Sequence, residues 1–452
     1  MSPLRNRIVP LVVLIQFATC LYDNGLFLFL KDHNTKLATS TDSTDHDIEN
    51  SLSNFYTFYR VILCLTSVLS AYFLARLRRK GYRRIPICVP LIGILFSRII
   101  LLFVIYFRLP IELMFASAAL NGITGSYTTL WASVKAWDSQ TTSESDRSLH
   151  LISIEMARGM AGMIINLAIT FIFAYLNISS LHGPVLTCGS IACYAFSVLH
   201  SIFILRTPDP DETPTENNTE QNPLTKTSFE DKEEKSTKID MQQDEESEAN
   251  GTVNSFSPRY LIIAMVISII LFEIAVKGTD DLIDVYMIRE PLKWGSLELF
   301  QGNAAYFLTQ VTSSLGVMIL SKYLSDMHLV IVGISSFCCG VVTMAFVQWT
   351  FLYYIARAMM AFSMIPVPIL YSAICKHSQG PAHGEIFVVL HLVIEVITVG
   401  SSACFSLIYQ LTAAWFPGFS FIIFGAIGLL SMIPVCIAWK YRVPSPSAEE
   451  TI

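Results

Sequence analysis

Ionisable side chains interrupt long apolar stretches of this sequence. They are Asp23, Arg60, Arg98, Glu155, Arg158, Glu273, Lys277, Arg357, His391 and Glu395. A charged group in the middle of a bilayer costs roughly 2.5–3.5 kcal/mol on insertion scales, so each should face other protein groups or a wet cavity. Carboxylates and imidazoles in such surroundings can exchange protons, and guanidinium or ammonium groups held there can bind anions.

Glu155 is our first candidate for proton exchange. It opens the sequence Glu-Met-Ala-Arg-Gly-Met-Ala-Gly (155–162), in which Arg158 follows three residues later. A carboxyl group moved between wet and dry surroundings would gain and lose a proton, whereas a permanent Glu155–Arg158 ion pair would be structural, and both interpretations stay open. His391 and Glu395 are a second candidate pair at i,i+4. For that pair we favour the structural alternative, a buried histidine satisfied by a neighbour.

The elements that position these groups are too apolar for water. The chain is 53% hydrophobic and 15% charged, whereas soluble domains carry roughly 25% charged residues. About 20 apolar residues cross a bilayer as a helix, and each half of the chain offers six such runs. They are approximately residues 8–30, 55–75, 85–107, 109–133, 151–176 and 184–205, then 260–278, 298–320, 328–348, 351–374, 385–410 and 418–440. We therefore predict an all-α polytopic membrane protein with twelve transmembrane helices in two halves, residues 1–206 and 259–452.

Residues 207–258, between the halves, differ from them in composition. They hold fourteen acidic residues against four lysines, which predicts a disordered loop because too little apolar surface is available to offset the entropy of ordering. The ten cysteines fall almost entirely in apolar runs, for example Cys64, Cys338, Cys339 and Cys404, and have no metal-ligand spacing. We expect buried thiols rather than a disulfide framework, and neither a metal site nor a cofactor.

Orientation follows from the basic residues. Six of them, from Arg76 to Arg84, crowd the connection after the second predicted span, which places that connection in the cytoplasm. Both termini and the acidic loop are then cytoplasmic, and the acidic first loop, Lys31 to Ser53, lies outside.

Short motifs spread over both halves are the most specific signal. They are Leu52-Ser53-Asn54-Phe55-Tyr56, Leu69-Ser70-Ala71-Tyr72, Ala119-Leu120-Asn121-Gly122, Arg289-Glu290-Pro291-Leu292-Lys293-Trp294, Tyr354-Ile355-Ala356-Arg357-Ala358 and Ile365-Pro366-Val367. These motifs resemble solute carrier family 46 of the major facilitator superfamily, which includes the proton-coupled folate transporter, and within it the thymic stromal cotransporter branch. The likeness fails only in the first and central loops. Two six-span halves joined by a long loop agree with the major facilitator fold.

The resemblance implies a carrier of bulky organic anions that works by alternating access and is often driven by protons. Folates, muropeptides and cyclic dinucleotides are the solutes associated with the family, which also places a carboxylate at Glu155. Two departures stand out. The acid of the usual Asp-x-x-Gly-Arg-Arg gate motif is missing from residues 79–84, and Tyr371 stands where the family has an arginine.

Solute in this architecture binds between the halves, against the first, fourth, seventh and tenth spans. The candidate substrate-binding residues are Arg357, Lys277, Glu273, Asp23, Asn121, Tyr127, Trp131 and Tyr371. Arg357 and Lys277 would hold the anion, whereas Arg98 is expected to pair inside the bundle. Helix packing beside Gly122 and Gly125 is an equally good explanation for the fourth-span residues.

Other functional classes fit less well. The sequence has no His-x-x-x-His pair, Walker loop or catalytic serine elbow, so we do not expect an enzyme. It also lacks the repeated filter sequence of a channel. A membrane receptor or scaffold acting through the acidic loop is the alternative. We expect a plasma-membrane transporter, with an endolysosomal membrane as the second choice, whose partners are a small organic anion, protons and the lipid bilayer but no nucleic acid polymer.

Overall fold

The computed structural model describes most of both predicted halves. The described residues are 5–40, 45–79, 82, 84–107, 109–140, 147–176, 182–204, 258–288, 292–377, 383–412 and 415–440. Every regular element in this part of the chain is an α-helix. The predicted acidic loop lies outside the described residues except for Pro258, where a helix begins.

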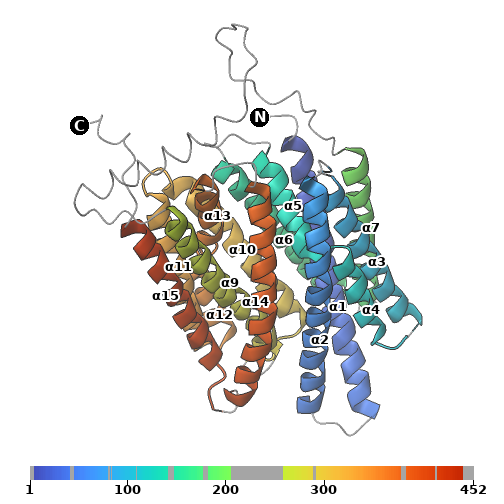
Figure 1. Cartoon of the computed structure of the whole chain (residues 1–452). Helices are drawn as coiled ribbons and strands as arrows, with labels where there is room; N and C mark the ends of the chain where they lie inside the picture. The colour runs from blue at the N-terminus through green and yellow to red at the C-terminus, as the bar shows by residue number, and fades with distance from the viewer. Residues whose placement is uncertain are drawn as a thin grey trace, which may run out of the picture.

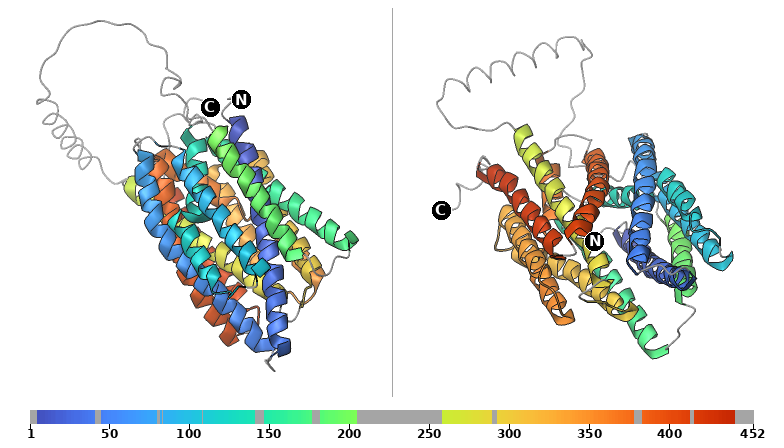
Figure 2. Two further views of the ribbon diagram at one scale, coloured as in Figure 1. Left: turned by 90° about the vertical axis from the view of Figure 1, so that its right-hand side faces the viewer. Right: turned by 90° about the horizontal axis from the view of Figure 1, so that it is seen from below.

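The helices form two neighbouring groups that run roughly side by side (Figures 1 and 2). The N-terminal group contains α1 (Arg5–Ser40), α2 (Asp45–Arg79), α3 (Ile85–Phe107), α4 (Leu113–Ile123), α5 (Ser126–Gln140), α6 (Arg147–Leu176) and α7 (His182–Phe203). The C-terminal group contains α9 (Pro258–Ile288), α10 (Ser296–Leu320), α11 (Asp326–Met344), α12 (Thr350–Met359), α13 (Pro366–His377), α14 (His383–Thr412) and α15 (Phe419–Lys440). Helix α1 begins and α15 ends on the same side of the molecule (Figure 1).

The outer surface of the bundle is apolar. Side chains such as Leu65 and Leu69 on α2 are 70% and 65% exposed, which is unfavourable in water and expected against lipid. Within the described residues, eight helices are long and apolar enough to cross a membrane: α1, α2, α3, α6, α7, α9, α11 and α15. The predicted all-α membrane class is confirmed, whereas the count of twelve spans is not established.

The fourth and tenth predicted spans are not continuous helices, which corrects the sequence-based ranges. The fourth is divided into α4 and α5 at Gly125, whose φ of +113° is a conformation that side chains with a Cβ rarely adopt. The tenth is divided into α12 and α13, and α13 begins at Pro366. Proline suits a first helical position but cannot donate the backbone hydrogen bond that a helix interior requires.

Two further expectations are wrong. Most of the predicted first loop, residues 31–53, is helical, because α1 continues to Ser40 and α2 begins at Asp45. Cys64 and Cys338 are buried as expected, but Cys339 and Cys404 are exposed. Both lie on helices whose outward faces are apolar, and a thiol tolerates such surroundings as a small apolar group does.

Helices from the two groups pack directly on each other. Helix α6 packs along α10, while α14 packs against α5 and α2. The α6–α10 packing is close: a Cβ added at Gly162 would lie 2.4 Å from a ring carbon of Phe307, and one added at Gly159 would lie 3.2 Å from Gln310 Cβ. The two glycines of the 155–162 segment, on the two turns that follow Glu155, thus let α6 and α10 approach closely.

Candidate functional site

A cavity of about 200 Å³ lies where the two groups of helices meet. Its walls come from α5 and α6 of the N-terminal group and from α9, α10, α13 and α14 of the C-terminal group. The charged residues that line it are Lys135, Glu155, Arg158, Glu273, Lys277 and Glu395, and the ring-bearing residues are Tyr127, Trp131, Tyr306, Tyr371 and His391. A concave site with aromatic walls and a few convergent charges suits a ring-bearing, charged ligand.

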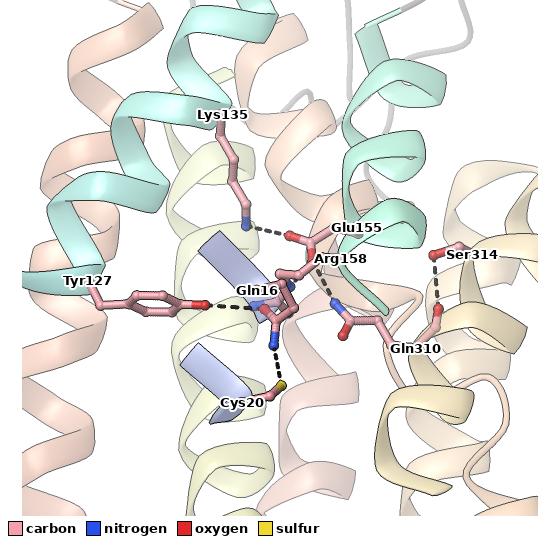
Figure 3. A network of polar contacts seen from close by, with 8 residues as sticks. All are labelled: Gln16, Cys20, Tyr127, Lys135, Glu155, Arg158, Gln310 and Ser314. Carbon is pink, nitrogen blue, oxygen red and sulfur yellow. Dashed lines mark hydrogen bonds and ion pairs between the residues drawn. The ribbon is translucent and has the colours of Figure 1, made fainter. Parts of the chain in front are cut away.

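Glu155 lies at the centre of the polar groups in this cavity (Figure 3). Its Oε1 lies 3.0 Å from the ammonium nitrogen of Lys135 on α5, and its Oε2 lies 3.0 Å from Nε of Arg158 on α6. From the C-terminal group, Gln310 Nε2 on α10 donates a hydrogen bond of 2.7 Å to the same Oε2. One carboxylate therefore contacts two cations of its own half and an amide of the other half.

The Arg158 contact is an ion pair without a directed hydrogen bond, because its Nε–H makes no hydrogen bond despite the short distance. The guanidinium carbon lies 5.3 Å from the centre of the Trp131 ring, a cation–π contact. Tyr127 meets Trp131 edge-on at 5.7 Å and donates a weak hydrogen bond of 3.4 Å to Gln16 Oε1 on α1. Arg158 is thus held between a carboxylate and an aromatic wall.

On the opposite wall, Tyr371 and His391 are partners. The Tyr371 hydroxyl lies 2.6 Å from His391 Nδ1, so the half-buried histidine has a hydrogen-bonding neighbour. The Lys135 ammonium lies 5.5 Å from the centre of the Tyr371 ring, which links α5 to α13 across the two groups. Lys277 is exposed, and among the described residues no carboxylate lies within ion-pair distance of its ammonium group.

Comparison with known proteins shows the family to which the chain belongs. No family model matches the sequence. The chain is 32% identical to mouse solute carrier family 46 member 2, covering 97% of this chain and 94% of the relative. The dog protein of the same name is 31% identical, covering 96% of this chain and 94% of the relative. The chain belongs to solute carrier family 46. The resemblance to the thymic stromal cotransporter branch is thereby confirmed.

Other members and solved structures agree. The chicken lysosomal proton-coupled steroid conjugate and bile acid symporter, also of family 46, is 25% identical over 90% of this chain and 84% of its own length. The human organic anion transporter MFSD10 has a TM-score of 0.63 at 13% identity, covering 96% of this chain and 100% of that chain. The Escherichia coli fucose:proton symporter has a TM-score of 0.56 at 13% identity, covering 96% of this chain and 98% of that chain. This family 46 chain therefore has the major facilitator fold and is a multi-pass membrane transporter.

The structure brings many of the predicted site residues of this family 46 protein together. Those that line the cavity are Glu155, His391, Glu395, Lys277, Glu273, Tyr127, Trp131 and Tyr371. Arg357, Asp23 and Asn121 do not line it. Arg357 is 5% exposed and donates a hydrogen bond of 2.9 Å from Nε to the Tyr353 hydroxyl. Asn121 is buried between helices, while Asp23 is exposed elsewhere on α1.

Arg98 lies inside the N-terminal group, as expected, but its partner is aromatic. Its guanidinium carbon lies 3.2 Å from the centre of the Tyr22 ring and 5.9 Å from that of Tyr194. A cation stacked on two rings is stabilised without a carboxylate partner. Arg98 therefore joins α3 to α1 and α7 and plays no part in the cavity.

Three polar residues of the site escaped the sequence analysis: Lys135, Gln310 and Gln16. Lys135 lies two residues beyond the predicted end of the fourth span, in a helix that continues to Gln140. Gln310 and Gln16 are uncharged and lie in the middle of apolar runs. An amide in hydrocarbon is costly unless it is hydrogen-bonded, so these glutamines carried a signal that a search for charges alone passes over.

Proposed function

We propose that this chain is a proton-coupled transporter of bulky organic anions that works by alternating access. The observation that supports it most is the position of Glu155, which contacts cations of one half and an amide of the other inside the cavity between them. Lys277, which has no carboxylate within ion-pair distance among the described residues, is the group that would hold the anion from the C-terminal side. The steroid conjugates named for the lysosomal relative, together with folates, muropeptides and cyclic dinucleotides, are the solutes to test first.

The proposed cycle uses the link between the halves. When Glu155 is ionised, its carboxylate accepts the hydrogen bond from Gln310, and a charged acceptor makes that bond roughly twice as strong as a neutral one. A proton on Glu155 weakens the link and so favours separation of α6 from α10 at this level. The proton and the anion then cross together as the halves rock about the site.

The membrane and the orientation belong to the same proposal. We place the protein in the plasma membrane with both termini cytoplasmic, as the basic residues between Arg76 and Arg84 indicate. Lysosomal residence, stated in the names of more distant family members, is the alternative. Co-localisation of the tagged protein with markers of each membrane separates the two.

Uptake by purified protein in liposomes tests the coupling. In a pH gradient, Glu155→Gln should still exchange labelled estrone sulfate, methotrexate or muramyl dipeptide across the membrane while losing uphill accumulation. The reason is that the glutamine imitates a permanently protonated carboxyl group. Exchange without a gradient is the control that separates loss of coupling from loss of transport.

The structural alternative predicts a different result. Without the carboxylate, Lys135 and Arg158 lose their counter-ion, and breaking a buried pair costs roughly 3–5 kcal/mol. Folded Glu155→Gln protein would then become scarce, and Glu155→Gln/Arg158→Gln would recover part of it. Normal pH-driven accumulation by the single variant would remove Glu155 from the mechanism and leave His391 and Glu395 as the next residues to test.

A further inference from the structure

Lys135 and Arg158 contact the same carboxylate, that of Glu155. Among the described residues, Glu155 is the one carboxylate within ion-pair distance of either group. The side chains of Lys135, Glu155 and Arg158 are 15%, 16% and 25% exposed, so all three are largely withdrawn from water and yet reach the cavity. A proton on Glu155 would leave two adjacent cations without a negative charge, which is unfavourable in such surroundings.

We infer that Lys135 and Arg158 form an anion-binding subsite that the carboxylate of Glu155 fills until a proton neutralises it. The inference rests on the proposed function and specifies how its site would work. An acidic group of the solute, a carboxylate, sulfate or phosphate ester, takes the place of the Glu155 carboxylate between the two cations. The indole of Trp131, 5.3 Å from the Arg158 guanidinium, then offers a surface for a ring next to that group.

The charges on the cavity wall determine how many negative charges of a solute can bind for each proton that Glu155 takes up. Among the described lining residues, three are basic (Lys135, Arg158 and Lys277) and three are acidic (Glu155, Glu273 and Glu395). The formal charge of the empty cavity is therefore balanced, and one proton on Glu155 leaves an excess of a single positive charge. The subsite thus admits one negative charge per proton, and cotransport of a monoanion with one proton moves no net charge.

The groups that surround Glu155 support this assignment. The groups that line the cavity with it are Lys135 of α5, Gln310 and Tyr306 of α10, Tyr371 of α13, His391 and Glu395 of α14, and Lys277 and Glu273 of α9, with Arg158 on its own helix. Gln16 and Cys20 of α1 lie beside this network (Figure 3). Because His391 is engaged by Tyr371, Glu155 is the group whose protonation frees the two cations. Linkage requires the converse as well: bound anion favours protonated Glu155.

Direct binding to purified protein in nanodiscs tests the subsite without requiring transport. The probes are tritiated estrone sulfate, a monoanion, and labelled muramyl dipeptide, a carboxylate, each at pH 5.5 and 7.5. Glu155→Gln should bind at pH 7.5 with the affinity that the unmodified protein reaches only at pH 5.5. Adding Lys135→Gln should weaken binding by roughly ten- to a hundredfold, the worth of one charge-assisted hydrogen bond, and Lys135→Arg should restore most of it.

Lys322→Gln is the matched control, because Lys322 is exposed and does not line the cavity. Lys135→Gln protein that binds both probes as well as Lys322→Gln protein would overturn the subsite. So would Glu155→Gln protein that binds no tighter at pH 7.5 than the unmodified protein. If Lys135→Gln protein fails to fold, the subsite is still tested by two measurements. They are the gain of probe binding at pH 7.5 in Glu155→Gln protein and the retention of that binding when Lys135→Arg is added.

Uptake in the same preparations separates this inference from the proposed function. Normal pH-driven uptake by Lys135→Gln protein would refute the subsite and leave proton-coupled transport standing. Binding with the expected variant pattern, but no uptake of any probe, would support the subsite and refute the proposed function.

Discussion

Gly162 on α6 packs closely against Phe307 on α10, and this contact gives a prediction of definite size. A Cβ added there would lie 2.4, 2.5 and 2.6 Å from three carbons of the Phe307 ring, about 1 Å short of an ordinary carbon–carbon contact. The ring lies across the position that the methyl group would occupy, so the ring or α10 must move. Overpacking of this kind costs about 1–3 kcal/mol.

Alanine also gains about 1 kcal/mol of helix propensity over glycine. Gly162→Ala should therefore lower the free energy of unfolding by about 0–2 kcal/mol. The displacement should also reach the Glu155–Gln310 hydrogen bond nearby and reduce transport. Gly425→Ala is the control, because Gly425 is likewise a buried helical glycine but the added Cβ would meet Val342 at an ordinary 3.4 Å. That variant should be neutral or slightly stabilised.

The assay is a double-mutant cycle on detergent-purified protein, unfolded by denaturant and by heat. In a Phe307→Ala background the ring is gone, so Gly162→Ala should no longer destabilise the protein, and the coupling between the two sites should be about 1–3 kcal/mol. Two results would contradict this explanation of the glycines by close α6–α10 packing. One is a Gly162→Ala protein as stable as the Gly425→Ala protein. The other is a Gly162→Ala substitution that changes the free energy of unfolding equally with and without the Phe307 ring.

Two further predictions concern a buried contact and the orientation. Tyr353→Phe should destabilise the protein by about 1.5–3 kcal/mol, because it removes the hydroxyl that accepts the hydrogen bond from buried Arg357. The neighbouring Tyr354→Phe is the control in the same denaturant assay, and equal stability of the two variants would show that the contact is unimportant. A cysteine introduced at Thr39 should react with an impermeant reagent added outside cells and one at Tyr82 should not; the reverse result would invert the proposed topology.

Much of the architecture was already determined by composition. A chain with 53% hydrophobic and 15% charged residues has to satisfy its backbone within itself in lipid, and helices do this locally. Helical spacing likewise placed Arg158 beside Glu155 and Glu273 beside Lys277, because residues three or four apart share a face. These relations lie within single helices, so no knowledge of the fold was needed to predict them.

What only the tertiary structure decided is which helices meet around Glu155 and how each one is rotated. Lys135 and Gln310 lie on α5 and α10, whereas Glu155 lies on α6. Only the packing of these helices brings the Lys135 ammonium nitrogen to 3.0 Å and Gln310 Nε2 to 2.7 Å from the Glu155 carboxylate. Arg357 shows the converse. It lies in the tenth predicted span, but the break before Pro366 separates its helix from the one that carries Tyr371. Helical periodicity relates side chains only within one continuous helix, so Tyr371 reaches the cavity while Arg357 is buried against Tyr353.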